Sequence, residues 1–130
     1  MSEIYRNAIY KYVVGPGKGN GGAVCGRDGG VWGHSETLEM SLEEARNIHR
    51  VCLKGLTGAN FVMSGVTFAI TDMNDDQTII SAKAVSYQSG CTIILTRGGF
   101  VVGYFDSPNT SEQSIIATKK LARYVKELGY

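Results

Sequence analysis

Two segments of the sequence have the letters of ligand-binding loops but lack the context that such loops need. The glycines of residues 17–22 follow the spacing of a dinucleotide-binding loop, in which a strand must lead into a helix N-terminus. Here the expected order is reversed, with a helix before the glycines and a strand after them. Residues 72–76 begin like a calcium loop, yet Gln77 replaces its glycine and Lys83 its bidentate glutamate. We interpret both segments as connections between elements.

Side chains that could act as nucleophiles or metal ligands are few and scattered. The two histidines, His34 and His49, have no cysteine or carboxylate at metal-ligand spacing. Cys25, Cys52 and Cys91 lie in apolar runs without a CxxC pair, which is typical of buried free thiols. No GxSxG or SxxK motif marks a catalytic serine. The sequence thus predicts no metal, no cofactor and no enzymatic activity, with an active site assembled from distant segments as the alternative.

Aromatic residues are concentrated near the two ends of the sequence. Tyr5 and Tyr12 lie at helical spacing, Trp32 follows in an expected strand, and Tyr124 and Tyr130 lie in the last segment. If the first and last helices pack side by side on a sheet, these rings form one surface. Flat rings bind proline-rich segments well because a polyproline II ligand is already ordered before it binds. A plain core between the two helices and the sheet is the alternative.

Composition is typical of one folded domain. The 130 residues are 43% apolar and 19% charged, and a chain of this length can bury about two-thirds of its unfolded surface. The formal net charge of +1 gives no overall field that would favour nucleic acid or an anionic membrane. No apolar run approaches the roughly 20 residues of a membrane span, and no charged leader precedes an apolar core. We expect a single domain over residues 1–130, in the reducing cytoplasm.

Three segments have the pattern of amphipathic helices. The first covers residues 4–13 and ends at the breaker run GPGKGNGG. The second begins with a capping box of Ser41 and Glu44, and the last begins with a capping box completed by Gln113 near Thr110. The inward stripe of the second helix is expected to consist of Leu42, Ala45, His49, Cys52 and Leu53.

Six short apolar or alternating runs predict strands. They cover residues 23–26, 31–34, 66–71, 78–85, 92–96 and 100–105. Most are separated by short turn signals, which favours antiparallel pairing. The order of elements predicts an α+β fold with a central six-stranded antiparallel sheet and helices grouped at its faces.

Three stretches of the sequence are similar to the profilin family. The first is AVCGRDGGVW at residues 23–32, which resembles the family's hairpin ending in Gly-x-x-Trp. The second joins GVTF at residues 65–68 to the glycine turn SGCT at residues 89–92. The third is PNTSEQSIIATKKLARY at residues 108–124, followed by a Leu-Gly-Tyr that ends at Tyr130. The likeness spans almost the whole chain, and the length and the order of elements agree with it.

The resemblance implies a profilin-like fold, with N- and C-terminal helices packed together on one face of the sheet. It also implies a monomeric, cytoskeletal protein that binds actin monomers, sequesters them and so regulates actin polymerisation. In the family, the actin surface is formed by the later strands and the start of the last helix. The positions assigned to actin binding are Thr67, Thr71, Lys83, Asn109, Thr110, Gln113, Ile116 and Lys120.

The resemblance implies two further partners. Proline-rich proteins would bind an aromatic groove, but Ala8 stands where the family has an aromatic residue, so a weakened site is expected. Phosphoinositides would bind the basic stripe of the last helix at Lys119, Arg123 and Lys126, for which a solvated helix face is the alternative. The residues assigned to the polyproline groove are Tyr5, Ile9, Trp32, Tyr124 and Tyr130.

A roadblock- or longin-like scaffold is the alternative reading of the same element pattern. Such a protein would dimerise through a sheet edge and an apolar helix and serve GTPase or motor complexes. Trp32 together with Tyr124 and Tyr130 favours the profilin interpretation, because a dimerising scaffold needs no aromatic cluster at its ends.

Overall fold

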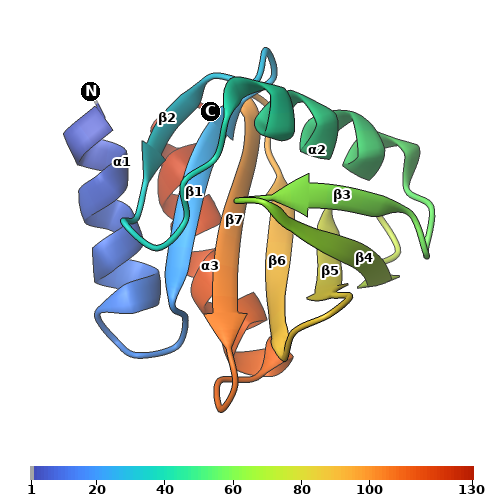
Figure 1. Ribbon diagram of the computed structural model, residues 1–130. Helices are drawn as coiled ribbons and strands as arrows, with labels where there is room; N and C mark the ends of the chain where they lie inside the picture. The colour runs from blue at the N-terminus through green and yellow to red at the C-terminus, as the bar shows by residue number, and fades with distance from the viewer. Residues whose placement is uncertain (1) are drawn as a thin grey trace.

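An antiparallel sheet with helices on both faces forms the protein (Figure 1). The structure is a computed structural model that describes residues 2–130. The helices are α1 (Ser2–Ile9), which continues into the π-helical turn η1 (Tyr10–Val14), α2 (Leu42–Lys54) and α3 (Ser111–Glu127). The strands are β1 (Gly21–Gly26), β2 (Val31–His34), β3 (Asn60–Met63), β4 (Val66–Met73), β5 (Ile79–Ala84), β6 (Ser89–Leu95) and β7 (Gly99–Asp106).

The sheet has seven strands and not the six expected from the sequence, in the order β2-β1-β7-β6-β5-β4-β3. Every neighbouring pair is antiparallel. The additional strand is β3, a four-residue edge strand that pairs with β4 through the turn at Ser64 and Gly65. Both turn residues have positive φ, 54° and 79°, as a tight two-residue hairpin requires.

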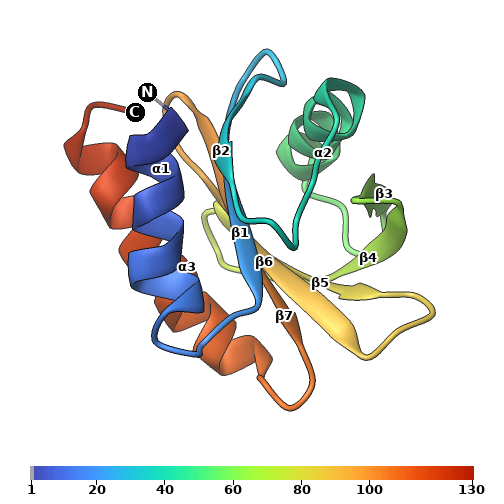
Figure 2. The same cartoon turned by 60° about the vertical axis from the view of Figure 1, so that its left-hand side comes forward.

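The first and last helices lie side by side on one face of the sheet, and α2 lies on the opposite face (Figure 2). This confirms the arrangement that the profilin resemblance implied. Each face has its own hydrophobic core. The core under α1 and α3 includes Ile9, Val24, Val101, Leu121 and Val125. The core under α2 includes Ile48, Phe61, Phe68, Ile93 and Phe100.

Close contact between α3 and the sheet depends on Gly103 of β7. A Cβ atom at this position would collide with the hydroxyl of Thr118 on α3. The buried hydroxyls of Thr92 on β6 and Ser114 on α3 share a 2.9 Å hydrogen bond in the same interface. The helix is therefore held in a fixed position on β6 and β7.

Both predicted capping boxes are present, but α2 buries a different stripe from the one expected. The Ser41 hydroxyl accepts a hydrogen bond from Glu44 N at 3.0 Å, and Gly55 ends the helix with φ 62°. Ala45, Ile48 and Cys52 are the buried residues of α2. Leu42 and Leu53, expected to point inward, are 53% and 61% exposed, because they lie to one side of the buried residues on the helix surface. His49 is half-buried.

All three cysteines are buried free thiols, as the sequence predicted. Burial raises the pKa of Cys25 and of Cys52 to about 12, and it raises the pKa of Cys91 further. None of the helices in residues 2–130 is both long and apolar enough to cross a membrane. Over the same residues, no three His, Cys, Asp or Glu side chains gather closely enough to hold a metal ion.

Candidate binding surfaces

Three rings from distant parts of the chain meet at one end of the α1 and α3 layer. Tyr5 of α1, Trp32 of β2 and Tyr130, which follows α3, form this terminal aromatic cluster. The ring centroids of Trp32 and Tyr130 are 5.1 Å apart, and that of Tyr5 lies 5.5 Å from Trp32 and 6.4 Å from Tyr130. The backbone N–H of Gly98, in the β6–β7 turn, donates to the Tyr130 carbonyl at 2.6 Å. That bond fixes the last residues against the sheet.

Exposure differs sharply among the residues assigned to the polyproline groove. Tyr130 is 38% exposed and Trp32 is half-buried, whereas Tyr5 is only 4% exposed and lies beneath them. Ile9 is fully buried, because α1 turns this side chain toward Gly22 of β1, so the assignment of Ile9 to the groove surface was wrong. Burial, followed by the nearby Tyr130 and Tyr124 hydroxyls, raises the pKa of Tyr5. Trp32 and Tyr130 are therefore the rings of the cluster that a ligand can reach.

Tyr124 belongs to a second aromatic group. Its ring pairs with Tyr12 of η1 at a centroid distance of 5.9 Å, and both side chains are half-buried. Lys11 places its Nζ 5.3 Å from the centroid of the Tyr12 ring. Between the two groups α1 presents Ala8, which is 4% exposed and adds no ring. The single aromatic surface expected from the sequence therefore consists of two groups along the α1–α3 layer.

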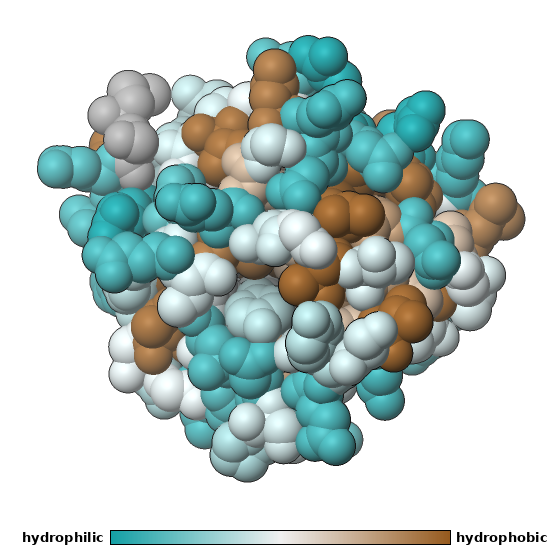
Figure 3. Space-filling view, viewed as in Figure 1, coloured by the Kyte–Doolittle hydropathy of each residue, from teal (hydrophilic) through white to brown (hydrophobic). Residues whose placement is uncertain are grey.

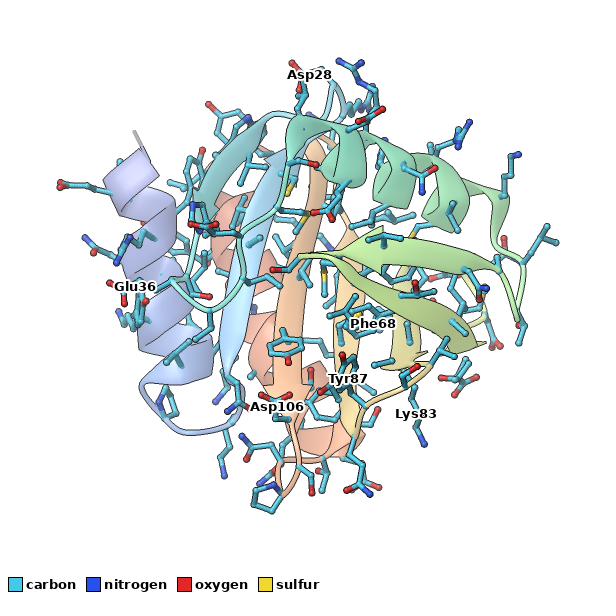
Figure 4. All side chains as sticks on the ribbon, in the orientation of Figure 1. Asp28, Glu36, Phe68, Lys83, Tyr87 and Asp106 are labelled. Atoms are coloured by element: carbon cyan, nitrogen blue, oxygen red, sulfur yellow. The ribbon has the colours of Figure 1, made fainter. Side chains whose placement is uncertain are left out.

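Polar contacts attach α1 to the loop that follows β2. Arg6 forms an ion pair with Glu36 at 3.2 Å, and the backbone N–H of Glu36 donates to the Tyr10 hydroxyl at 3.2 Å (Figure 4 labels Glu36). The ion pair is exposed and contributes little stability by itself, about 0–1 kcal/mol. Together the contacts fix the direction of α1 beside β2, on which the aromatic cluster depends.

The strand residues assigned to actin binding share the outer face of β4 and β5. Thr67 and Thr71 alternate with the buried Phe68 and Ile70, and Lys83 lies opposite Ala69 in the strand register. All three assigned side chains are exposed. Because β-strand side chains alternate between faces, they lie on the side of the sheet that carries α3.

Of the residues assigned to actin binding at the last helix, some have side chains that are hydrogen-bonded within the protein and others have exposed side chains. Thr110 and Gln113 are committed to the capping box of α3. Asn109 Nδ2 donates to Asn20 Oδ1 at 3.1 Å, so it too is held inside the protein. Ile116 is 57% exposed and Lys120 is exposed. These last two residues are free to contact a partner.

Sequence reasoning missed two exposed apolar residues beside this surface. Val85 is 63% exposed and Tyr87 is 65% exposed. The backbone N–H of Val85 donates to the Thr67 carbonyl at 3.0 Å, which continues the pairing of β5 with β4. Figure 4 shows Lys83 and Tyr87 near the same end of the sheet. The period of two that starts at Lys83 could have identified Val85, since both point to one face.

The three residues assigned to phosphoinositides line one groove. Lys119, Arg123 and Lys126 are exposed on the side of α3 that faces Ile79 of β5 and Ile94 of β6. The groove therefore lies between the helix and the outer face of the sheet, next to the β4–β5 surface.

Comparison with protein-family models identifies the family to which this chain belongs. The family model described as Profilin matches residues 4–130. The chain belongs to the profilin family. Profilin-1 of Entamoeba histolytica is 32% identical over 130 residues, which cover 97% of this chain and 98% of that protein.

Solved profilin structures share the fold over nearly the whole chain. Acanthamoeba castellanii profilin II matches with a TM-score of 0.82 at 17% identity, covering 97% of this chain and 99% of the other. LokiProfilin1, solved in complex with rabbit actin, matches with a TM-score of 0.77 at 16% identity and covers 98% of each chain.

Because the chain belongs to the profilin family, the roadblock- or longin-like interpretation is wrong. Such a scaffold was expected to dimerise through a sheet edge and an apolar helix. On the face that carries α2 and β3, hydrophobic side chains form separate patches among polar ones (Figure 3).

Proposed function

We propose that this profilin family member binds monomeric actin, acts as a monomer and regulates actin polymerisation. The observation that carries the proposal is the profilin match over residues 4–130. A solved profilin with the same fold over 98% of this chain forms a complex with rabbit actin. The family places its actin surface on the later strands and the start of the last helix. In this chain those elements present exposed side chains on one side of the sheet.

The proposed actin surface combines charge with exposed apolar area. Lys83 and Lys120 supply positive charge, and Ile116 and Val85 supply apolar contacts that are 57% and 63% exposed in the free protein. An acidic partner surface would be attracted to the lysines, and burial of the apolar side chains would supply much of the affinity. Val85 therefore joins the residues assigned from the resemblance.

A pair of matched variants tests this surface. Ile116→Glu places a charge at an exposed apolar position of α3 without disturbing the core. It should weaken actin binding by at least about tenfold, because the carboxylate would be desolvated without a partner. Leu53→Glu is the control, since Leu53 is 61% exposed on the opposite face of the sheet. The measurement is inhibition of pyrene-labelled actin polymerisation; no effect of the wild-type protein on any of several actins would overturn the proposal.

We propose proline-rich segments as a second class of ligand, bound at Trp32 and Tyr130. The support is the terminal aromatic cluster, in which these two rings reach the surface while Tyr5 packs beneath them. Trp32 is the single tryptophan of the chain, so its fluorescence reports directly on this site. Oligoproline should change that fluorescence at sub-millimolar concentration. A flat titration into the millimolar range would contradict the proposal.

We further propose that Lys119, Arg123 and Lys126 bind phosphoinositide headgroups, and that the protein acts in the cytoplasm without enzymatic activity. The groove that these three cations line supports the lipid proposal. Co-sedimentation with vesicles that contain phosphatidylinositol bisphosphate should fall when Arg123 and Lys126 are both changed to Gln. Equal binding to vesicles of neutral lipid would contradict it.

A further inference from the structure

The outer side of α2 carries exposed apolar and basic side chains. Leu42 is 53% exposed and Leu53 is 61% exposed, and the arginines between them, Arg46 and Arg50, are also exposed. Figures 1 and 2 show no helix or strand of residues 2–130 beyond α2 on that side. These four residues form the α2 stripe, which belongs neither to the proposed actin surface nor to the aromatic cluster.

The α2 stripe is one narrow row on the helix surface. With 3.6 residues per turn, its four positions fall within a sector of about 80°. At about 1.5 Å per residue, Leu42 and Leu53 are about 16 Å apart along the helix axis, and Arg46 and Arg50 are about 6 Å apart. The row therefore has an apolar side chain at each end and two positive charges between them.

The two arginines are held in place by neutral acceptors. Arg46 Nε donates to the Asp28 carbonyl at 3.2 Å, and Arg50 donates to the side-chain oxygen of Asn47. These contacts restrain both side chains without neutralising their charge. Within residues 2–130, neither arginine forms an ion pair with a carboxylate. A partner's carboxylates would thus meet two guanidinium groups that are already positioned, which lowers the entropic cost of binding.

The acidic residues near the α2 stripe do not cancel its charge. The Glu44 carboxylate is committed to backbone N–H groups of its capping box and of the β3–β4 turn, and that of Asp28 to its own turn. Glu43 is exposed and forms no ion pair in the described part of the chain. A further cation, Arg27, lies close enough to α2 to lower the pKa of His49, after the larger effect of burial. The stripe therefore favours an acidic partner.

The spacing along the α2 stripe fits a helical partner better than an extended one. On a second helix, side chains eleven residues apart lie on one face and match the separation of Leu42 and Leu53, while carboxylates four residues apart match Arg46 and Arg50. A strand covers about 16 Å in about five residues, and residues five apart in a strand point to opposite faces. An extended segment could therefore contact only one of the two leucines.

Two other occupants fit the α2 stripe poorly. Two copies of this chain packed through antiparallel α2 helices would place Arg46 of one copy against Arg50 of the other, where like charges repel. A helix that lies in a membrane surface needs a broad apolar face. Here the arginines interrupt the apolar area between Leu42 and Leu53.

We infer that the α2 stripe binds an acidic amphipathic helix of a partner protein. Apolar side chains of the partner contact Leu42 and Leu53, and its carboxylates pair with Arg46 and Arg50. Burial of the leucines supplies affinity, and the charge pairs fix the register and direction of the bound helix. Because α2 lies on the opposite face of the sheet from α1 and α3, this interaction is separate from the proposed function (Figure 2).

A designed helical peptide serves as the probe. It is fluorescein-labelled, has about 18 residues, and is rich in alanine so that it forms a helix. It has two leucines eleven residues apart and four glutamates between them, placed to face the arginines in either direction of the peptide. A second peptide has glutamine in place of each glutamate, and a third has one leucine moved to the opposite side of the helix.

Fluorescence anisotropy compares four proteins with the acidic peptide. They are the wild type, the double variant Arg46→Gln/Arg50→Gln, Leu53→Glu, and the control Lys11→Gln/Lys18→Gln. The control removes the same charge at exposed positions in η1 and in the loop that follows it. Thermal unfolding checks that each variant folds.

The acidic peptide should bind the wild-type protein at sub-millimolar concentration in low salt, and more weakly as the salt concentration rises. The double arginine variant should bind it about fivefold or more weakly. Leu53→Glu should weaken binding by about tenfold or more, because it replaces an apolar contact with a charge that repels the peptide. The control should stay within about twofold of the wild type.

The inference is overturned if the peptide does not bind at millimolar concentration, or if the control loses as much affinity as the double arginine variant. Equally tight binding of the glutamine peptide, or of the peptide with the moved leucine, would also overturn it. If anionic vesicles bind through Arg46 and Arg50 and the peptide does not, the α2 stripe is a membrane contact and not a site for a helix. Inhibition of pyrene-labelled actin polymerisation tests the proposed function separately from all of these outcomes.

Discussion

His49 is a half-buried histidine of α2, and its protonation should affect stability. Its ring stacks on Phe100 at a centroid distance of 5.8 Å and an angle of 12°. Burial, followed by the positive charge of Arg27, lowers the pKa of His49 below its ordinary value of 6.5. The unfolded chain therefore binds a proton more readily than the folded one below about pH 6.5. As the pH falls from 6.5 toward the lower folded pKa, the free energy of unfolding should decrease.

Urea unfolding at pH 7 and at pH 5.5 measures this effect. His49→Gln should reduce the loss of unfolding free energy between the two pH values, because it removes the group that titrates differently in the two states. His34→Gln removes the other histidine and serves as the control. An unchanged pH dependence in His49→Gln would show that other groups cause the acid destabilisation.

The three thiols should be unreactive in the folded protein. Cys25 and Cys52 are each 1% exposed and have a pKa raised to about 12, so almost no thiolate is present near pH 8. Cys91 is equally buried. A chromogenic disulfide reagent should therefore label no thiol in native buffer and all three in denaturant. Fast labelling of one thiol in the native protein would reveal local opening of the α2 layer.

At the scale of elements, Glu44 connects the start of α2 to the β3–β4 hairpin. Its carboxylate accepts from Ser41 N at 3.3 Å, from Ser64 N at 3.1 Å and from Gly65 N at 3.0 Å. Glu44→Gln leaves a single acceptor oxygen and removes the charge. We expect a loss of about 1–2 kcal/mol in the free energy of unfolding. Glu43→Gln, in the same helical turn, should cost much less; equal losses in urea unfolding would contradict this role.

The elements that the sequence predicted are those with strong local signals. Each capping box marks the start of a helix, and the turn at Asp28 marks where β1 ends and β2 begins. The structure confirms all three signals. The strand β3 lacked such a signal: it has four residues, of which Asn60 and Val62 are exposed, and its pairing depends on the Ser64–Gly65 turn and on Glu44 from another element. The buried side of α2 was misjudged because Leu42 and Leu53 lie to one side of the buried residues Ala45, Ile48 and Cys52 on the helix surface, and both are mostly exposed.

At the candidate sites, too, the sequence predicted what depends on local signals and missed what depends on other elements. The aromatic residues near both ends could be recognised from the sequence, but their depth could not. Ile9 and Tyr5 lie under the surface because α1 packs on both β1 and β2, which only the three-dimensional arrangement determines. Val85 was missed for the opposite reason: its apolar character suggested a core residue, but it points outward directly after the end of β5.

At the scale of the whole molecule, the order of the sheet separates the surfaces proposed for actin and for proline-rich segments. Trp32 lies on β2, at one edge, whereas Thr67 and Lys83 lie on β4 and β5 near the other edge. Four strand spacings separate β2 from β5, which is about 19 Å at 4.8 Å per spacing. Along α3, Ile116 lies near the start and Tyr130 follows the end. A partner at either surface leaves the other accessible.

This separation predicts independent binding of actin and oligoproline. Ile116→Glu should weaken actin binding and leave the oligoproline titration of Trp32 unchanged, because Ile116 is an exposed residue near the start of α3 and Tyr130 follows the end of that helix. Tyr130→Ala should do the reverse, with normal inhibition of pyrene-actin polymerisation. Saturating oligoproline should likewise leave the actin affinity of the wild-type protein within about twofold, since coupling requires differential contacts between the sites. A change of tenfold or more in either cross-measurement would mean that α3, which both surfaces share, shifts when one of them is occupied.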